Sequence, residues 1–179
     1  MHHSSPSPWV RRFAPLIPAG GLVLDFACGS GRHARLLAEM GYRVEAVDRD
    51  AASLESLAGV PGITTRIADL EQQPWPYLPS SFDGVVVTNY LYRPRFDALL
   101  DLLKPGGVLI YETFMVGNEA LDKPSNPDYL LRPHELLDRV RGRLDVVAFE
   151  QGCVDEPKPA VMQKICAIAP LDSQNARRF

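Results

Sequence analysis

Short apolar runs alternate with amphipathic stretches along most of the chain. The apolar runs have the length of buried strands, and several stretches between them carry apolar residues at helical spacing. Gly- and Pro-rich turns separate the two kinds of segment,. This alternation predicts an α/β domain with a largely parallel sheet. The predicted strands are 22–25, 43–47, 63–67, 82–87, 108–113, 144–150 and 160–168, and the predicted helices are 9–17, 34–40, 50–57, 95–103 and 133–140.

Two parts of this pattern predict where strands lie in the sheet. Residues 82–87 are apolar on both faces, as a central parallel strand should be,. The last two predicted strands follow each other without a helix between them, so we expect them to pair as a hairpin,.

The first strand, the turn and the second strand bring two acids together. Asp25 ends the first strand, and Asp48 follows the second. Between them lies the small-residue turn Ala27-Cys28-Gly29-Ser30-Gly31. Its glycines permit a turn that a side chain would block, and they let a ligand approach the backbone. An acid at the tip of the second strand suits a ribose with two free hydroxyls, so the unit predicts a nucleoside-cofactor site.

The turn also fits the dinucleotide pattern G-x-G-x-x-G/A, through Gly29, Gly31 and Ala34,. An NAD-dependent oxidoreductase is therefore one reading of the chain. Asp25 argues against it, because a carboxylate there would repel a pyrophosphate but could face a cationic group such as an α-amine. The Tyr-x-x-x-Lys pair of many such enzymes is also missing at Tyr111, which has Met115 four residues later.

Composition narrows the class further. The chain has 179 residues, enough for one domain with a sizeable core,. Its net charge of −3 gives no electrostatic case for nucleic acid,. No apolar run approaches the ~20 residues of a membrane helix, and the opening residues lack an apolar signal core. Three scattered cysteines suit a reducing compartment and predict neither a disulfide frame nor a metal site, so we expect a cytoplasmic protein,.

Several motifs in order resemble those of the class I S-adenosylmethionine (SAM)-dependent methyltransferases. DFACGSG resembles their first motif, D/E-x-G-x-G-x-G, with Ala27 in place of the first glycine. FDGVVVTNY and LLKPGGVLIYET match two later motifs in position, and the resemblance covers about residues 9–168. It implies a three-layer αβα Rossmann-like sandwich with seven strands in the order 3-2-1-4-5-7-6 and an antiparallel last strand. The small single-domain type is loosely similar to tellurite-resistance and thiopurine-type enzymes.

The resemblance also implies roles for particular residues, with SAM as cofactor and S-adenosylhomocysteine as product. Asp25 would hold the α-amine, Asp48 the ribose hydroxyls, and Asp69 with Leu70 the adenine. Arg49 would stack beside the adenine or stay in solvent. The remaining cofactor candidates are Ala27, Cys28, Gly29, Ser30, Gly31, Thr88 and Asn89.

The acceptor side is less sharply defined. Candidates for a general base, named from position alone, are Glu112, Tyr92, Tyr90 and His134. Residues 114–129 form a long polar segment after a central strand, and we expect it to be a substrate lid,. Its candidate contact groups are Asn118, Glu119, Asn126 and Tyr129.

The expected organisation is a lead (1–8), one catalytic domain (9–170) and a tail (171–179). The lack of an added recognition domain favours a small-molecule acceptor. The NPPY or DPPY tetrapeptide of amino-methyltransferases is absent after the fourth strand, which counts against base or protein-amide methylation. We expect no membrane association, and a monomer or a homodimer. A SAM-binding module without turnover remains a third reading.

Overall fold

The computed structural model describes residues 5–171, so most of the expected lead and tail lies outside the described residues. The helices are α1 (Pro8–Phe13), α2 (Arg32–Glu39), α3 (Ala51–Glu55), α4 (Phe96–Leu100) and α5 (Glu135–Val140). The strands are β1 (Leu22–Phe26), β2 (Arg43–Asp48), β3 (Ile63–Ile67), β4 (Phe82–Thr88), β5 (Leu103–Phe114), β6 (Asp145–Val154) and β7 (Ala160–Ile168). Short 3₁₀ turns are η1 (Ala14–Leu16), η2 (Arg93–Arg95), η3 (Asn118–Ala120) and η4 (Pro127–Tyr129).

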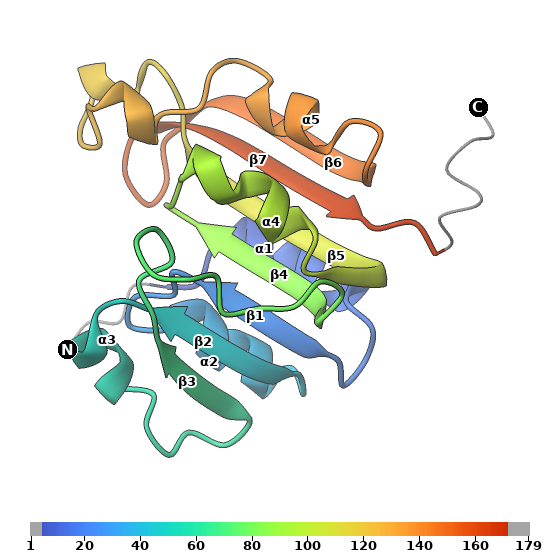
Figure 1. Cartoon of the computed structure of the whole chain (residues 1–179). Helices are drawn as coiled ribbons and strands as arrows, with labels where there is room; N and C mark the ends of the chain where they lie inside the picture. The colour runs from blue at the N-terminus through green and yellow to red at the C-terminus, as the bar shows by residue number, and fades with distance from the viewer. Residues whose placement is uncertain (1–4, 172–179) are drawn as a thin grey trace.

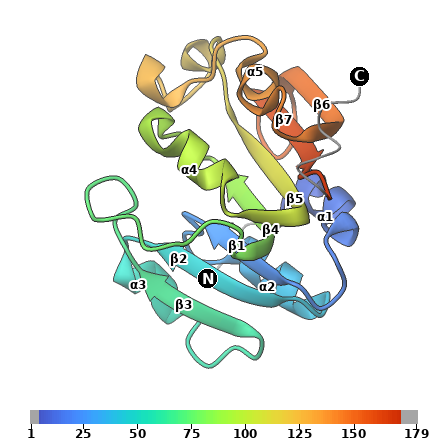
Figure 2. The ribbon, with the colours of Figure 1, turned by 45° about the vertical axis from the view of Figure 1, so that its right-hand side comes forward.

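The strands form one seven-stranded sheet in the order β3-β2-β1-β4-β5-β7-β6, which confirms the predicted topology. β1 to β5 are parallel, and β7 runs antiparallel to both β5 and β6. The order reverses direction between β1 and β4, because β2 and β3 lie on one side of β1 and β5 lies beyond β4. Helices cover both faces, as Figures 1 and 2 show. Such a reversal is where open α/β sheets bind ligands.

Alternating side chains of the central strands fill two separate cores. On β4, Val85 and Val87 pack with the cluster that includes α4 and α5. Val86 packs instead with the cluster that includes α1, α2 and Leu54 of α3. All three valines are fully buried. This double burial explains why residues 85–87 carry no polar alternation, as a central strand requires.

The N-terminal helix lies across a face of the sheet. Ser7 caps α1, with its Oγ accepting from the backbone N–H of Trp9 at 3.1 Å,. The Trp9 indole donates to the carbonyl of Ile165 on β7. Ser7 also donates its own N–H to Nε2 of His33, which is 1% exposed. The helix predicted at 9–17 is therefore present in two pieces, α1 and η1.

Several predicted boundaries differ from the structure, and the largest difference lies between α4 and β5. The helix expected to run to Leu103 ends at Leu100. The backbone N–H groups of Ser81 and Phe82 bond to the carbonyl of Leu102, and Leu103 pairs with Phe82. β5 therefore begins at Leu103, earlier than predicted, and its register shifts before Gly84. Pairing with β4 satisfies these backbone groups better than one more helical turn would.

Candidate functional site

A cavity of about 440 Å³ opens at the carboxyl ends of the parallel strands. Six of the predicted cofactor residues line it, and they follow β1, β2, β3 and β4 in turn. They are Ala27, Asp48, Arg49, Asp69, Leu70 and Asn89. The cavity therefore lies at the switch point of the sheet, where the sequence predicted a nucleoside site.

Asp48 fixes the glycine turn against the end of β2. Its Oδ2 accepts from the backbone N–H of Gly29 at 2.8 Å, and its Oδ1 accepts from that of Asp50 at 3.0 Å. Cys28 donates its own N–H to the carbonyl of Val47. Each carboxylate oxygen has a second lone pair, so Asp48 can hold the turn and still accept from a ligand hydroxyl.

The residues of the turn itself have unusual backbone conformations. Ala27 has a φ of +53°, which an alanine adopts only under strain,. Gly29 and Gly31 also have positive φ, where glycine carries no such cost,. Burial raises the pKa of the Cys28 thiol above its ordinary value, and the nearby carboxyls of Asp25 and Asp48 raise it further. That thiol is therefore no nucleophile at neutral pH.

Asp25 lies beneath this turn and is 1% exposed. Burial raises the pKa of its carboxyl to about 8, although the N–H of Ala34 and the charge of Arg32 oppose the shift and Asp48 adds to it. Its Oδ2 accepts no hydrogen bond from residues 5–171. A buried carboxyl with one unpartnered oxygen is costly to ionise, unless a cation comes to it.

Asp69 begins the far wall of the cavity. Its Oδ1 accepts from the backbone N–H groups of Gln72 and Glu71, and these bonds lower the pKa of its carboxyl. The carboxylate is therefore ionised and fixed in place at neutral pH. Leu70 and Arg49 line the same wall.

A smaller cavity of about 300 Å³ adjoins the first. The two share Glu71, Leu91 and Tyr129. Tyr92 and Asp128 also line the smaller cavity. Sequence reasoning did not name Glu71 or Asp128, although Glu71 lies only two positions after the predicted Asp69.

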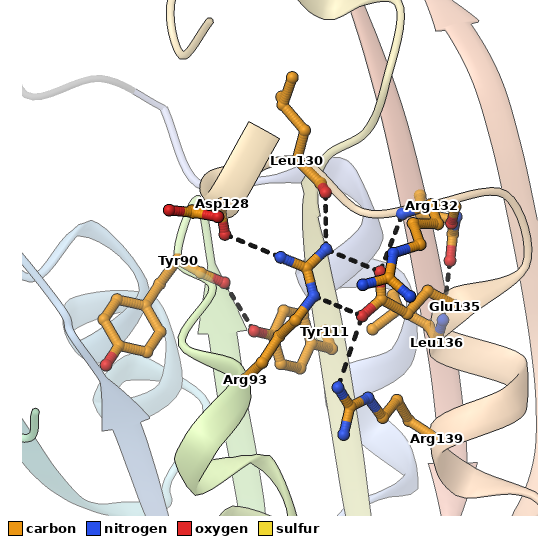
Figure 3. A network of polar contacts seen from close by, with 10 residues as sticks. Tyr90, Arg93, Tyr111, Asp128, Leu130, Arg132, Glu135, Leu136 and Arg139 are labelled. Carbon is orange, nitrogen blue, oxygen red and sulfur yellow. Dashed lines mark hydrogen bonds and ion pairs between the residues drawn. The ribbon is translucent and has the colours of Figure 1, made fainter. Parts of the chain in front are cut away.

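The segment after β5 is tied down by an ion-pair network, drawn in Figure 3. Arg93 donates to both oxygens of Glu135, at 2.7 and 2.9 Å. The same guanidinium donates to the carbonyls of Leu130 and Asp128, at 2.7 and 2.9 Å. The second oxygen of Glu135 also accepts from the backbone N–H of Arg132. The network therefore joins η2, the segment after β5 and α5.

The four candidate contact groups of residues 114–129 lie in different environments. Tyr129 lines both cavities. Asn118 is fully buried and accepts from the N–H of Val161, so it is part of the scaffold. Glu119 and Asn126 accept from backbone N–H groups within their own turns.

The four candidates for a general base also lie in different parts of the fold. Tyr90 lines the larger cavity and Tyr92 the smaller one. Glu112 is 6% exposed and lies in register with Thr88 on the α1 side of the sheet. His134 begins α5 and contacts Gln151 on β6. Of these four, the two tyrosines line one or other of these two cavities, and Glu112 and His134 line neither.

The other six predicted cofactor residues are not among those that line the larger cavity. They are Asp25, Cys28, Gly29, Ser30, Gly31 and Thr88. Thr88 Oγ1 lies 3.4 Å from Nδ1 of His33, whose Nε2 accepts from Ser7. Within residues 5–171 no group of three or more metal-ligating side chains comes together. Nor is any helix in that range long and apolar enough to cross a membrane.

Comparison with known proteins gives this geometry a context. Residues 23–107 match a family model described as a methyltransferase domain. A tRNA U34 carboxymethyltransferase of Methylococcus capsulatus is 33% identical over 123 residues, which cover 63% of this chain and 38% of that protein. The chain spans between 38% and 55% of the length of the curated relatives it matches.

Solved structures share the fold. TehB from Haemophilus influenzae superposes with a TM-score of 0.78 at 18% identity, over 93% of this chain and 63% of that one. A 1,6-didemethyltoxoflavin-N1-methyltransferase from Burkholderia thailandensis, with bound S-adenosylhomocysteine, superposes with a TM-score of 0.66 at 19% identity. That match covers 91% of this chain and 79% of the other. The resemblance seen in the sequence is thus confirmed: residues 23–107 match a methyltransferase-domain model, and the chain has the fold of class I SAM-dependent methyltransferases.

Proposed function

We propose that this chain transfers a methyl group from SAM to a small-molecule acceptor. The observation that carries the proposal is Asp25, whose buried carboxyl has an oxygen without a partner among residues 5–171. It lies beneath a glycine turn at the switch point of a class I methyltransferase fold. An α-ammonium group would supply the missing donor and the missing charge.

The residues around the larger cavity suit the ribose and the adenine of SAM. Asp48 has lone pairs left for ribose hydroxyls after bonding Gly29 and Asp50,. Asp69 and Leu70 lie where an adenine would end. Figure 1 shows how the ends of β1, β2 and β3 lie side by side, so one extended nucleoside can touch all three.

Bound SAM would supply a methyl group activated by its sulfonium. The lone pair of the acceptor would form the new bond to that carbon, and the sulfur would keep the electron pair of the bond that breaks. The chain then has to align the acceptor and keep water out. Burial raises the pKa of Tyr90 above its ordinary value, and the neighbouring Glu71 adds to the shift. Tyr90 therefore keeps its proton at neutral pH and cannot act as a base.

A small acceptor is favoured by the charge of the site. The smaller cavity has two carboxylates in its wall, Glu71 and Asp128, and its one arginine is bonded to Glu135. A nucleic-acid backbone would need free cations at this opening.

Calorimetric titration with S-adenosylhomocysteine, and separately with NAD, tests the proposal. We expect micromolar binding of the first and none of the second. Asp48→Asn should weaken binding at least about tenfold, because an amide cannot accept from both Gly29 and Asp50 and still bind ribose. Glu55→Gln, an exposed carboxylate on α3, is the matched control. Binding of NAD alone would favour the oxidoreductase reading, and binding without turnover of labelled SAM in an acceptor screen would favour a module without catalysis.

The two glycines of the turn should respond differently to alanine. A Cβ on Gly31 would overlap the side chain of buried Leu57, whereas one on Gly29 would meet no atom within 4 Å. We expect Gly31→Ala to lower the free energy of unfolding by about 2–4 kcal/mol, from overpacking and left-handed strain. Gly29→Ala should lower it by about 1 kcal/mol, from strain alone.

The same pair should separate stability from ligand binding. In Gly29→Ala the added methyl occupies open space beside the turn that the ligand is proposed to approach, so we expect affinity for S-adenosylhomocysteine to fall at least about tenfold,. Urea denaturation gives the stabilities, and calorimetry gives the affinities. Equal affinity of wild type and Gly29→Ala would show that the ligand does not approach this turn.

A further inference from the structure

The smaller cavity indicates what kind of acceptor the site takes. It adjoins the proposed cofactor cavity through Glu71, Leu91 and Tyr129. We propose that the acceptor binds in this smaller cavity and carries a positively charged nitrogen, held by Glu71, Asp128 and the surrounding tyrosine rings. This inference rests on the proposed methyl transfer and names the chemical class of its acceptor.

The first support is a fixed carboxylate at the junction of the two cavities. The backbone of Glu71 is held at both ends of the residue, because its N–H donates to Asp69 Oδ1 at 2.9 Å and its carbonyl accepts from Arg95. Its carboxylate forms no ion pair with any basic side chain of residues 5–171. A half-buried carboxylate without a counterion favours a cationic ligand,.

The second support is the state of the arginine in the same wall. Four N–H···O contacts occupy the Arg93 guanidinium, two to Glu135 and one each to the carbonyls of Leu130 and Asp128. A guanidinium has five N–H donors, so little remains for a ligand. Its charge is also balanced by Glu135. An anionic acceptor would therefore meet two carboxylates and no free cation in this wall.

The third support is the set of tyrosine rings around the two cavities. Tyr92 and Tyr129 line the smaller cavity, and Tyr90 lies in the wall of the larger one close to Glu71. Tyr129 is 49% exposed, so its ring is accessible to a ligand. Aromatic faces beside a carboxylate attract ammonium groups and protonated heterocycles, including nitrogens that carry methyl groups and have no N–H left to donate.

A set of three simple aromatic probes tests the proposal on the full chain. Benzyltrimethylammonium carries a permanent cation, phenylacetate an anion, and benzyl alcohol no charge. Each is titrated by ligand-observed NMR into protein saturated with S-adenosylhomocysteine, whose own binding is measured first by calorimetry. We expect the cation to bind at least about tenfold more tightly than the other two.

Variants then locate the binding. Glu71→Gln should weaken the cation about five- to tenfold, and the exposed Asp128→Asn about threefold. Glu150→Gln, an exposed carboxylate on β6 away from both cavities, should have no effect. Asp128→Asn leaves the buried parts of the chain unchanged, so it tests the charge even if Glu71→Gln folds poorly.

The outcomes distinguish the two proposals. If S-adenosylhomocysteine binds but phenylacetate binds as well as the cation, or if neither carboxylate variant changes cation affinity, the acceptor class is wrong and the proposed function stands. If S-adenosylhomocysteine does not bind, the proposed function fails, and the acceptor class fails with it.

Discussion

Binding of S-adenosylhomocysteine at pH 7 is expected to release about one proton, and Asp25→Asn is expected to abolish that release. Burial holds the pKa of Asp25 near 8 in the ligand-free protein, so the carboxyl is mostly protonated at pH 7. A ligand ammonium beside the unpartnered Oδ2 would stabilise the ionised form and bring this pKa well below 7,. Calorimetry in buffers of different ionisation enthalpy counts the released protons. Asp155→Asn, an exposed acid in the β6–β7 turn, is the control and should release as many as the wild type.

The same group makes the stability of the ligand-free protein depend on pH. The pKa of Asp25 is about 8 in the folded state, and the ordinary value for an aspartate is 3.8. The folded chain therefore holds a proton that the unfolded chain has lost between these values. The contribution of Asp25 to the free energy of unfolding should be largest below about pH 4. It should fall by at most about 1.4 kcal/mol per pH unit as the pH rises to about 8. Asp25→Asn should flatten this part of the profile, and an unchanged slope in urea denaturation would contradict the assignment.

The sheet could be predicted from the sequence because its strands are locally recognisable. Residues 85–87 are apolar on both faces because both faces are buried, and the turn at Gly29–Gly31 needs glycine for local backbone reasons. Once the ends of β1 and β2 are predicted, Asp25 and Asp48 are identified as the acids at their tips. Their position at one edge of the sheet then follows from parallel topology alone,.

The acceptor side could not be predicted in this way. Glu112 and Thr88 lie at the expected ends of strands, but side chains alternate along a strand, and both point toward the α1 side of the sheet,. Glu71, which does line the cavities, follows β3 in an irregular connector that carries no periodic signal. Ion pairs between distant segments, such as Arg93 with Glu135, cannot be predicted from either residue's local sequence.

Loss of the Arg93–Glu135 pair should have a large effect on stability,. Glu135→Gln is expected to lower the free energy of unfolding by about 3 kcal/mol, because it leaves a largely buried guanidinium without its counterion,. Asp138→Asn on the same helix is the matched control. Its carboxylate is 64% exposed and pairs with an exposed Arg141, so we expect a change below about 0.5 kcal/mol,. Urea denaturation of the three proteins measures both changes.

The position of the pair also predicts a functional consequence and a pH dependence. Burial alone would raise the pKa of Glu135, but hydrogen bonds from Arg93 and Arg132 outweigh it and hold the pKa below its ordinary value of 4.5. The pair therefore stabilises the chain at neutral pH, and its contribution is lost as the pH falls below 4.5 through the lower folded pKa. Because Arg93 also holds the carbonyls of Asp128 and Leu130, Glu135→Gln should loosen the segment that presents Tyr129 to both cavities. Faster amide exchange there in Glu135→Gln, with unchanged exchange in β1 and β4, would be the expected sign. Uniformly faster exchange would mean that the pair stabilises only the fold as a whole.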